Sequence, residues 1–219
     1  MTADSAGQSP GELGVVHVDA SLLVVCKPAG LLSVPGRGAD KQDCVSARIQ
    51  ALYSDALVVH RLDMATSGLM LFARGAEVQR RLSTAFEARA ISKRYVAVVQ
   101  GCVALDAGDI DLPLLTDWPN RPLQKVDLAN GKPSLTRYTV LARNTAQSSS
   151  RLLLEPVTGR SHQLRIHLRE LGHPIWGDAL YAPPAVLALS TRLLLHATSL
   201  LFSHPMTGEA LQFESATPF

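Results

Sequence analysis

Residues 60–73 read HRLDMATSGLMLFA and join two apolar runs through a polar loop. The run LVV at 57–59 precedes the loop and the run LMLFA at 69–73 follows it, a pattern that predicts strand, loop and strand. Gly68 is expected to let the backbone turn sharply. Loops held between strands often carry chemistry, because a rigid scaffold presents them to solvent. Asp63, the one carboxylate of this loop, is therefore the first candidate for a functional group.

The composition favours one ordinary globular domain. The chain has 219 residues, of which 47% are apolar, and it shows no internal repeat, low-complexity block or linker. The formal charge of +2 indicates no particular partner by itself. The three cysteines, Cys26, Cys44 and Cys102, form no disulfide framework, so reduced thiols in a cytoplasmic protein are the simplest interpretation.

The ends of the chain predict no export signal and no membrane anchor. The N-terminus lacks a basic region followed by an apolar core, and no run approaches the ~18 apolar residues of a membrane helix. Residues 1–12 are small and polar and are expected to be a disordered tail. We expect a soluble cytoplasmic protein, with no membrane partner, whose domain covers residues 13–219.

Two helices are expected in the first half of the chain. Asp43 is a candidate N-cap for the first of them. The residues on its apolar face are Val45, Ile49 and Leu52. Residues 76–89 predict the second helix, and its outward face is basic. Residues 74–94 hold six Lys or Arg against two Glu, which indicates a solvated face or a surface that follows RNA phosphates.

Short runs rich in β-branched residues predict most of the remaining structure. The expected strands are residues 14–18, 22–26, 92–99, 135–142, 151–155 and 209–213. Residues 112–133, rich in Pro and Gly, are expected to be a long irregular connection. A further helix is expected to begin after Ser161 as N-cap and to end at Gly172. These elements predict a single α+β domain on a largely antiparallel mixed sheet with flanking helices and loops.

Several kinds of site are missing from the sequence. There are seven histidines but no His-Glu-x-x-His, and His162 and His167 would lie on different faces of one helix. No nucleophile elbow, Gly-rich phosphate loop or dinucleotide motif is present. We therefore expect no metal, no cofactor and no bound nucleotide cofactor.

The loop resembles a known active site when it is taken as a whole. An isolated Arg-x-Asp is usually structural, with Asp63 capping a turn and Arg61 as its partner. The longer string, His-Arg-Leu-Asp followed two residues later by Thr-Ser-Gly, resembles the active-site signature of the RluA family of pseudouridine synthases. The element KPAGL at 27–31 precedes it, as in that family. The resemblance covers about residues 15–215.

The resemblance implies a role for each of several residues. Asp63 matches the catalytic aspartate, acting as nucleophile or as base, Tyr95 matches the tyrosine that stacks on the target uracil, and Arg165 matches the arginine that pairs with the aspartate. Arg61 resembles the residue that fills the gap left in the RNA stack. The other residues expected at the substrate are His60, Thr66, Arg160, His162, Leu194 and Leu195, with one of the two leucines forming an apolar wall.

Each of these residues also has an ordinary structural interpretation. Tyr95 would suit a half-buried strand position, and Arg165 would suit a surface pair with Glu170. Leucines such as Leu194 and Leu195 are usually core residues. Four motifs in the family's order and at compatible separations nevertheless favour the functional interpretation.

The activity that the resemblance implies is isomerisation of uridine to pseudouridine in structured RNA. The target nucleotide must be flipped out of its stack to be reached. The carboxylate must stay ionised, which a nearby guanidinium favours. Residues 117–126 (DWPNRPLQKV) resemble a compact family member that modifies a tRNA anticodon arm and a large-subunit rRNA hairpin. We expect such RNA partners, a monomer, and no N-terminal RNA-binding domain of the ribosomal S4 type.

Two activities of other classes remain as alternatives. The first is a non-catalytic RNA-binding or ribosome-assembly protein on the same fold. The second is a nucleosidase-like hydrolase, which would release free uracil. Glycoside hydrolases ordinarily pair two carboxylates, and no second catalytic carboxylate is identifiable from the sequence.

Overall fold

The computed structural model describes residues 13–219, which form twelve strands and four α-helices. The strands are β1 (Gly14–Val18), β2 (Leu22–Lys27), β3 (Ala56–Val58), β4 (Ser67–Arg74), β5 (Ser92–Gln100), β6 (Ala107–Asp111), β7 (Leu114–Thr116), β8 (Gln124–Val126), β9 (Leu135–Asn144), β10 (Ser149–Pro156), β11 (Leu195–Ser203) and β12 (Ala210–Glu214). The helices are α1 (Val45–Leu52), α2 (Ala76–Glu87), α3 (Gln163–Glu170) and α4 (Pro184–Leu187), with two 3₁₀ turns, η1 (Ala39–Lys41) and η2 (Trp118–Asn120). The tail expected at residues 1–12 lies outside the described residues.

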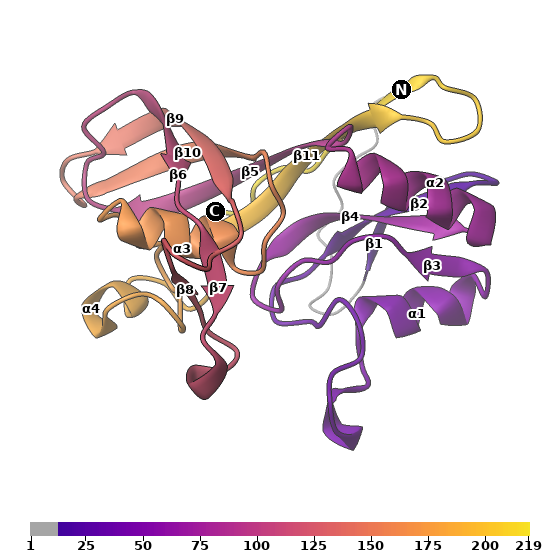
Figure 1. The fold of residues 1–219 in the computed structure, drawn as a ribbon, viewed down its shortest axis with the longest axis horizontal. Coiled ribbons are helices and arrows are strands. Elements are labelled where there is room, and N and C mark those ends of the chain that lie inside the picture. The colour runs from indigo at the N-terminus through magenta and orange to yellow at the C-terminus, as the bar shows by residue number, and fades with distance from the viewer. Residues whose placement is uncertain (1–12) are drawn as a thin grey trace.

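Ten of the strands form one mixed sheet that runs the length of the molecule (Figure 1). The strand order is β1-β2-β4-β11-β5-β10-β9-β6, with β3 paired to β4 and β12 paired to β11. Within the described chain, the pairing of β4 with β11 is parallel and every other strand pairing is antiparallel. The α+β class and the largely antiparallel sheet expected from the sequence are therefore confirmed.

The parallel junction is short and depends on Gly68. Its register joins His196 to Ser67 and Ala197 to Gly68. Gly68 has φ +115°, and a Cβ added there would lie 2.2 Å from the carbonyl oxygen of Ala197. The expectation that Gly68 turns the loop is wrong, because this glycine lies inside β4 and allows two backbones to approach closely.

The first half of the sheet is covered on both faces, which explains its uninterrupted apolar strands. Leu22 and Val24 of β2 pack with the buried residues of α2. Leu23 and Val25, which point to the opposite face, pack with the buried residues of α1. Figure 1 shows α1 and α2 beside this part of the sheet.

The expected cap of α1 is wrong by one residue. The helix is capped by Cys44, whose Sγ accepts a hydrogen bond from the Ala47 N–H. Asp43 instead accepts hydrogen bonds from the guanidinium of Arg48. Leu52, expected on the apolar face, is the last helical residue and is 70% exposed. The backbone N–H groups of a helix and a nearby guanidinium thus compete for a carboxylate that lies just before the helix.

The start of α3 also differs from the expectation. The helix begins at Gln163, and its N-cap is His162 rather than Ser161. His162 has φ +56°, in the left-handed region, and its side chain makes no capping bond. Gly172, with φ +88°, follows the helix as expected. The strained turn at His162 aims its imidazole away from the helix and toward the 60–66 loop.

Residues 112–133 are more ordered than the sequence indicated. They contain the two-stranded hairpin β7–β8, in which Leu114 faces Val126. Leu114 packs with Ile166 of α3 and with Tyr181, a small cluster that ties the hairpin to the rest of the molecule. Such a short hairpin carries too few apolar residues to be recognised from sequence pattern alone.

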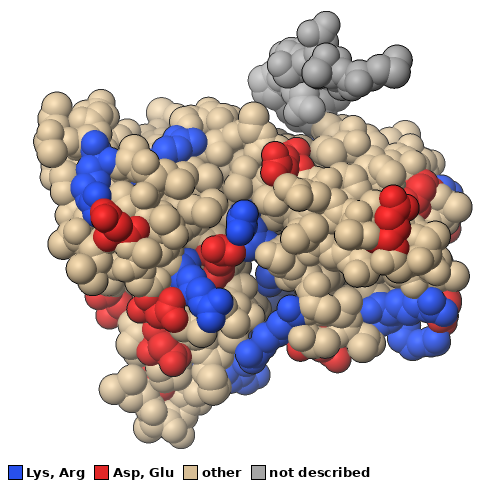
Figure 2. All heavy atoms as spheres, turned by 90° about the horizontal axis from the view of Figure 1, so that it is seen from above, with Lys and Arg blue, Asp and Glu red and all other residues tan. Residues whose placement is uncertain are grey.

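The fold brings two halves together around a central cleft. The first half contains β1 to β4 with α1 and α2, and the second contains β6 to β10 with α3 and α4 (Figure 1). Figure 2, seen from above, shows Lys and Arg side chains gathered along the hollow between the halves. Within residues 13–219, no helix is long and apolar enough to cross a bilayer.

Candidate active site

A buried lysine fixes the loop that carries Asp63. Lys27 is 0% exposed, and its Nζ donates to the carbonyl oxygens of Pro28, Leu31 and Met64 at 2.9, 2.7 and 2.9 Å. Burial lowers the pKa of Lys27 to about 7, against the opposing effect of the Asp63 charge. The KPAGL element therefore clamps the residue that follows Asp63.

Three more hydrogen bonds hold the residues that precede Asp63. The Ser33 hydroxyl donates to the Leu62 carbonyl at 2.7 Å and accepts from the Leu62 N–H at 3.1 Å. His60 accepts from the Leu71 N–H through Nε2 at 2.9 Å. Burial lowers the pKa of His60 to about 3, helped by the charge of Lys93. His60 lines the cleft, but this nitrogen serves the backbone of β4.

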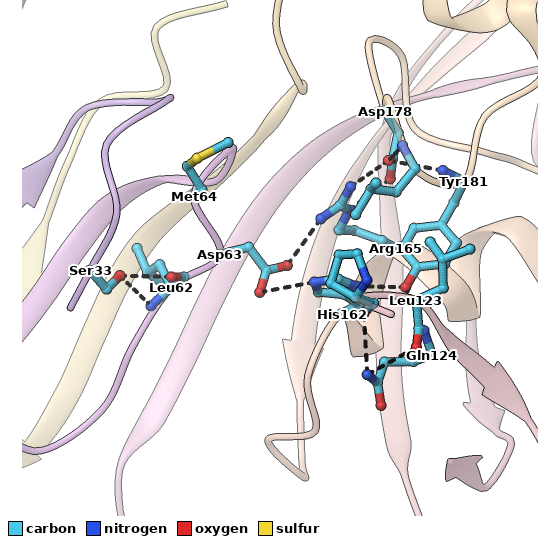
Figure 3. Close-up of polar contacts among 12 residues, drawn as sticks. Ser33, Leu62, Asp63, Met64, Leu123, Gln124, His162, Arg165, Asp178 and Tyr181 are labelled. Carbon is cyan, nitrogen blue, oxygen red and sulfur yellow. Dashed lines mark hydrogen bonds and ion pairs between the residues drawn. The ribbon is translucent and has the colours of Figure 1, made fainter. Parts of the chain in front are cut away.

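Asp63 meets a guanidinium that comes from the opposite wall of the cleft (Figure 3). Its Oδ2 accepts a hydrogen bond from Nη1 of Arg165 at 3.3 Å. Because 102 residues separate the two in sequence, only the closed fold brings them together. The pairing expected between Asp63 and Arg165 is thus present. The alternative, a surface pair between Arg165 and Glu170, is absent, because Glu170 pairs with Arg169.

A second carboxylate anchors the same arginine from behind. Asp178 is 1% exposed, and its two oxygens accept from Nε and Nη2 of Arg165 at 2.8 and 2.5 Å. Oδ1 also accepts from the backbone N–H groups of Leu180 and Tyr181. Burial opposes the charge of Arg165, but the hydrogen bonds and charges of Asp178 and Asp63 outweigh it and raise the pKa of Arg165. Arg165 is therefore a fixed cation at the base of the cleft.

His162 lies on the other side of the Asp63 carboxylate. Its Nε2 is 3.8 Å from Oδ1 of Asp63, and its Nδ1 is 2.5 Å from the hydroxyl of Tyr181. The Tyr181 hydroxyl accepts from the Gln124 N–H. With that hydroxyl donating to Nδ1, the single proton of the neutral imidazole is assigned to Nε2. Burial lowers the pKa of His162, while the charge of Asp63 opposes this shift. A neutral imidazole N–H therefore faces the carboxylate.

These groups line a cavity of about 760 Å³, within the roughly 300–1,000 Å³ of pockets that hold small organic ligands. Nine of the ten residues expected at the site contribute to its walls. They are His60, Arg61, Asp63, Thr66, Tyr95, Arg160, His162, Arg165 and Leu195. Leu194, which precedes β11, does not line the cavity and packs against the core of the second half.

Tyr95 presents an aromatic side chain to this cavity from the middle of the sheet. It lies on β5 between Ala197 of β11 and Leu154 of β10. Burial raises the pKa of Tyr95, and the charge of Asp63 raises it further. The phenol is therefore neutral at physiological pH and offers a flat, uncharged surface.

Basic side chains surround the mouth of the cavity. The Lys and Arg residues in its walls, besides Arg165, are Arg61, Arg89, Lys93, Arg137 and Arg160. The carboxylates in its walls are Asp63, Glu87 and Glu155. This excess of positive charge suits a polyanionic ligand. Among the described residues, no group of three His, Cys, Asp or Glu side chains could hold a metal ion.

Three residues of the site were not assigned a role from the sequence. They are Ser33, Asp178 and Tyr181, none of which was among the residues expected at the site. Asp178 lies 13 residues from Arg165, across the end of α3, so no helical or strand spacing links them. A buried arginine requires a counter-charge, and this requirement would have been the one signal for a second carboxylate.

Comparisons with known proteins agree on what this chain is similar to. A family model described as "RNA pseudouridylate synthase" matches residues 21–170. The chain is 48% identical to "Dual-specificity RNA pseudouridine synthase RluA" of Pasteurella multocida and 47% identical to the protein of that name from Escherichia coli K12, in each case over 94% of both chains. Human RNA Pseudouridylate Synthase Domain Containing 1 superposes with a TM-score of 0.80 at 26% identity, over 98% of this chain and 87% of that one. Human RNA Pseudouridylate Synthase Domain Containing 4 gives 0.75 at 26% identity, over 94% and 88%.

Proposed function

The chain belongs to the RluA family of RNA pseudouridine synthases, and we propose that its isomerisation of uridine depends on the carboxylate of Asp63. The observation that carries this proposal is the position of Asp63 between Arg165 and His162 on the wall of a basic cavity. The loop is clamped on both sides of Asp63, by Ser33 at Leu62 and by Lys27 at Met64. A carboxylate held in this way is pre-positioned for a reacting group.

The reaction breaks the bond between N1 of uracil and C1′ of ribose, turns the base, and forms a bond from C5 to C1′. The proton on C5 is lost to solvent and N1 gains one, so the isomerisation needs neither oxidant nor reductant. Asp63 acts on the flipped nucleotide either as a nucleophile or as a base. Arg165 holds the carboxylate in place, and Asp178 holds Arg165.

The cavity also has the surfaces that a flipped base requires. Tyr95 supplies an aromatic face for the uracil ring and Leu195 an apolar wall. Arg61 is exposed at the mouth, where its side chain can take the place of the extruded base in the RNA stack. Thr66, Arg160 and His162 are placed to contact the ribose or the neighbouring phosphates.

The substrate class follows from the relatives rather than from the cavity. The names of the two bacterial relatives describe dual specificity for RNA. Together with the resemblance of residues 117–126 to a compact family member, this supports a tRNA anticodon arm and a large-subunit rRNA hairpin as the substrates that we propose. We further propose that one domain, residues 13–219, suffices, and that the protein acts as a monomer in the cytoplasm. All three cysteines are free thiols, which suits a reducing compartment.

Release of tritium tests the proposal. Transcripts of both RNA types carry uridine tritiated at C5, and conversion to pseudouridine releases that tritium to water. Asp63→Asn is expected to release none while its affinity for the RNA stays within about threefold, because the amide keeps the shape of the side chain. Asp106→Asn, a change at an exposed carboxylate on the far end of the second half, is the matched control and should match the wild type.

The products separate the alternatives. Turnover by Asp63→Asn near the wild-type rate would remove Asp63 from the mechanism. Release of free uracil would indicate a nucleosidase-like hydrolase. RNA binding by the wild type without tritium release from any transcript would indicate a binding or assembly protein.

A further inference from the structure

A second cavity of about 450 Å³ adjoins the first along the floor of the cleft. The two cavities share Arg61, Leu62, Asp63 and His162, so they form one continuous path past the carboxylate. One wall of the second cavity is the segment 32–37, and the other is the hairpin β7–β8. In Figure 1 the tip of this hairpin and the loop that carries η1 project on the same side of the molecule, one from each half.

An arginine stacked on a tryptophan forms part of the hairpin wall. The Arg121 guanidinium carbon lies 3.4 Å from the centroid of the Trp118 ring. Arg121 lines the second cavity, whereas Trp118 lies behind it and is 65% exposed. In residues 13–219 no carboxylate lies within ion-pair distance of Arg121. A cation that is held against a ring and lacks a counter-charge is available for a ligand.

The stacked pair is fixed relative to the active carboxylate. The turn that carries it is closed by hydrogen bonds from the Asp117 N–H to the Leu123 carbonyl and from the Leu123 N–H to the Asn120 carbonyl. The next residue, Gln124, donates its N–H to the Tyr181 hydroxyl, and that hydroxyl contacts His162 beside Asp63 (Figure 3). One short chain of bonds therefore links the hairpin to the reacting centre.

We propose that Arg121, backed by Trp118, is a stacking shelf for the unpaired base of the nucleotide next to the flipped uridine. This inference rests on the proposed function, since the second cavity adjoins the one that would hold the flipped nucleotide. The second cavity is lined by Arg37, Arg61 and Arg121 against the single carboxylate of Asp63, which suits an RNA backbone. Unpaired bases in protein–RNA complexes stack on aromatic rings and on guanidinium planes.

The test combines protein variants with abasic RNA. In the anticodon-arm transcript, each nucleotide flanking the target uridine is replaced in turn by an abasic nucleotide. Arg121→Ala is expected to raise KM on intact RNA roughly ten- to hundredfold, while kcat at saturation changes by less than about threefold. At one of these positions, the abasic nucleotide should raise the KM of the wild type by the same factor and should leave the KM of Arg121→Ala unchanged.

Three comparisons make the outcome specific. Arg121→Lys keeps the charge but not the planar group, so stacking predicts that it resembles Arg121→Ala, whereas a phosphate contact predicts recovery of KM. Trp118→Ala removes the backing of the guanidinium and should raise KM as well. Arg143→Ala, an exposed arginine of β9 outside both cavities, is the control and should leave KM unchanged.

Fluorescence gives a readout that does not depend on turnover. Trp118 and Trp176 are the two tryptophans of the chain, so Trp176→Phe leaves Trp118 as the single tryptophan, whose emission can be excited selectively over that of the tyrosines. Binding of the intact transcript should change its emission, and the transcript with the critical abasic position should not. The stacking proposal would be overturned if the KM increases caused by Arg121→Ala and by the abasic nucleotide added up at every position. It would also be overturned if Arg121→Lys kept the KM of the wild type. Absence of tritium release by the wild type would instead overturn the proposed function.

Discussion

Arg165 stands between two carboxylates that have different tasks. Asp178 is buried and binds it through two short hydrogen bonds, while Asp63 is partly exposed and shares one longer bond. Asp178 therefore compensates most of the positive charge of the buried Arg165 guanidinium. Asp63, with one longer bond and a partly exposed side chain, is the less constrained of the two carboxylates. Arg165 thus links the buried Asp178 to the more exposed Asp63 and helps to fix the position of the Asp63 carboxylate.

Asp178→Asn is expected to lower both stability and turnover. The amide keeps the volume of the side chain but leaves the Arg165 charge with Asp63 alone, which should cost about 3 kcal/mol of the free energy of unfolding. Turnover should fall at least about tenfold, because the arginine is no longer held from behind. Denaturant unfolding and tritium release measure the two effects. Glu170→Gln, which breaks the exposed pair with Arg169, is the control and should change stability by less than about 0.5 kcal/mol.

His196 is a titratable group at the centre of the sheet. Its Nδ1 bonds the Ser67 hydroxyl at 2.8 Å and its Nε2 bonds the Ser215 hydroxyl at 3.1 Å. The guanidinium of Arg192 donates to the same Ser67 hydroxyl, so the Ser67 proton points at His196. Burial lowers the pKa of His196 from 6.5 to about 4, and the charge of Arg192 adds to this. The fold therefore requires the neutral imidazole.

Stability should consequently depend on pH through His196. Between pH 4 and 6.5 the unfolded chain binds a proton that the folded protein excludes, so the contribution is complete above pH 6.5 and is lost as the pH falls to 4. The difference is about 3 kcal/mol. His196→Gln, which retains hydrogen-bonding groups without the titration, should flatten this part of the stability profile. His17→Gln, on the outer strand β1, is the control, and an equal flattening there would contradict the assignment.

At the scale of the elements, the strands with long apolar runs were predictable, whereas the short strands β6, β7 and β8 and the helix ends were not. Apolar runs such as those of β2 and β4 predict strands, because a strand that is covered on both faces buries the side chain of every residue. A helix cap depends on which of several nearby polar side chains accepts the hydrogen bond from a backbone N–H of the first turn. Asp43 bonds Arg48 and leaves the cap to Cys44, and Ser161 yields the N-cap position to a strained His162.

Gly68→Ala should disrupt the junction between β4 and β11. The new methyl group would lie 2.2 Å from the Ala197 carbonyl oxygen and 2.5 Å from its nitrogen, so the strands must separate. We expect a loss of about 4 kcal/mol or more in the free energy of unfolding. Gly208→Ala is the control, since Gly208 also has a positive φ but nothing within 4 Å of the added Cβ. It should cost about 1–2 kcal/mol, and a similar loss in both variants would show that the backbone angle alone matters.

At the scale of the whole molecule, the sequence indicated nine of the residues that line the cavity but not what joins them. A long family motif identified Asp63, and the motif containing Arg165 identified its partner. Lys27, Asp178 and Tyr181 act through contacts that cross the fold, and no local pattern encodes such contacts. The second cavity is likewise a product of two distant segments and could be found only in three dimensions.

RNA affinity should depend steeply on salt because of the basic cleft. Each phosphate neutralised by a cation adds about −0.9 to the slope of log affinity against log salt for a duplex, and about −0.7 for a single strand. Arg89→Gln and Arg160→Gln, at the mouth of the first cavity, should each lower the magnitude of the slope by about 1. Arg143→Gln should leave it unchanged. Filter binding across a salt series measures the slopes, and unchanged slopes in all three variants would place the RNA elsewhere.

The parallel junction of β4 and β11 has a consequence for how the enzyme responds to force. Only two residue pairs join these strands, and the Asp63 loop enters β4 directly beside them, while Arg165 belongs to the other half. A rotation of one half against the other about this junction would therefore change the distance between Asp63 and Arg165. The geometry of the sheet and the pairing of Asp63 with Arg165 are thus mechanically coupled.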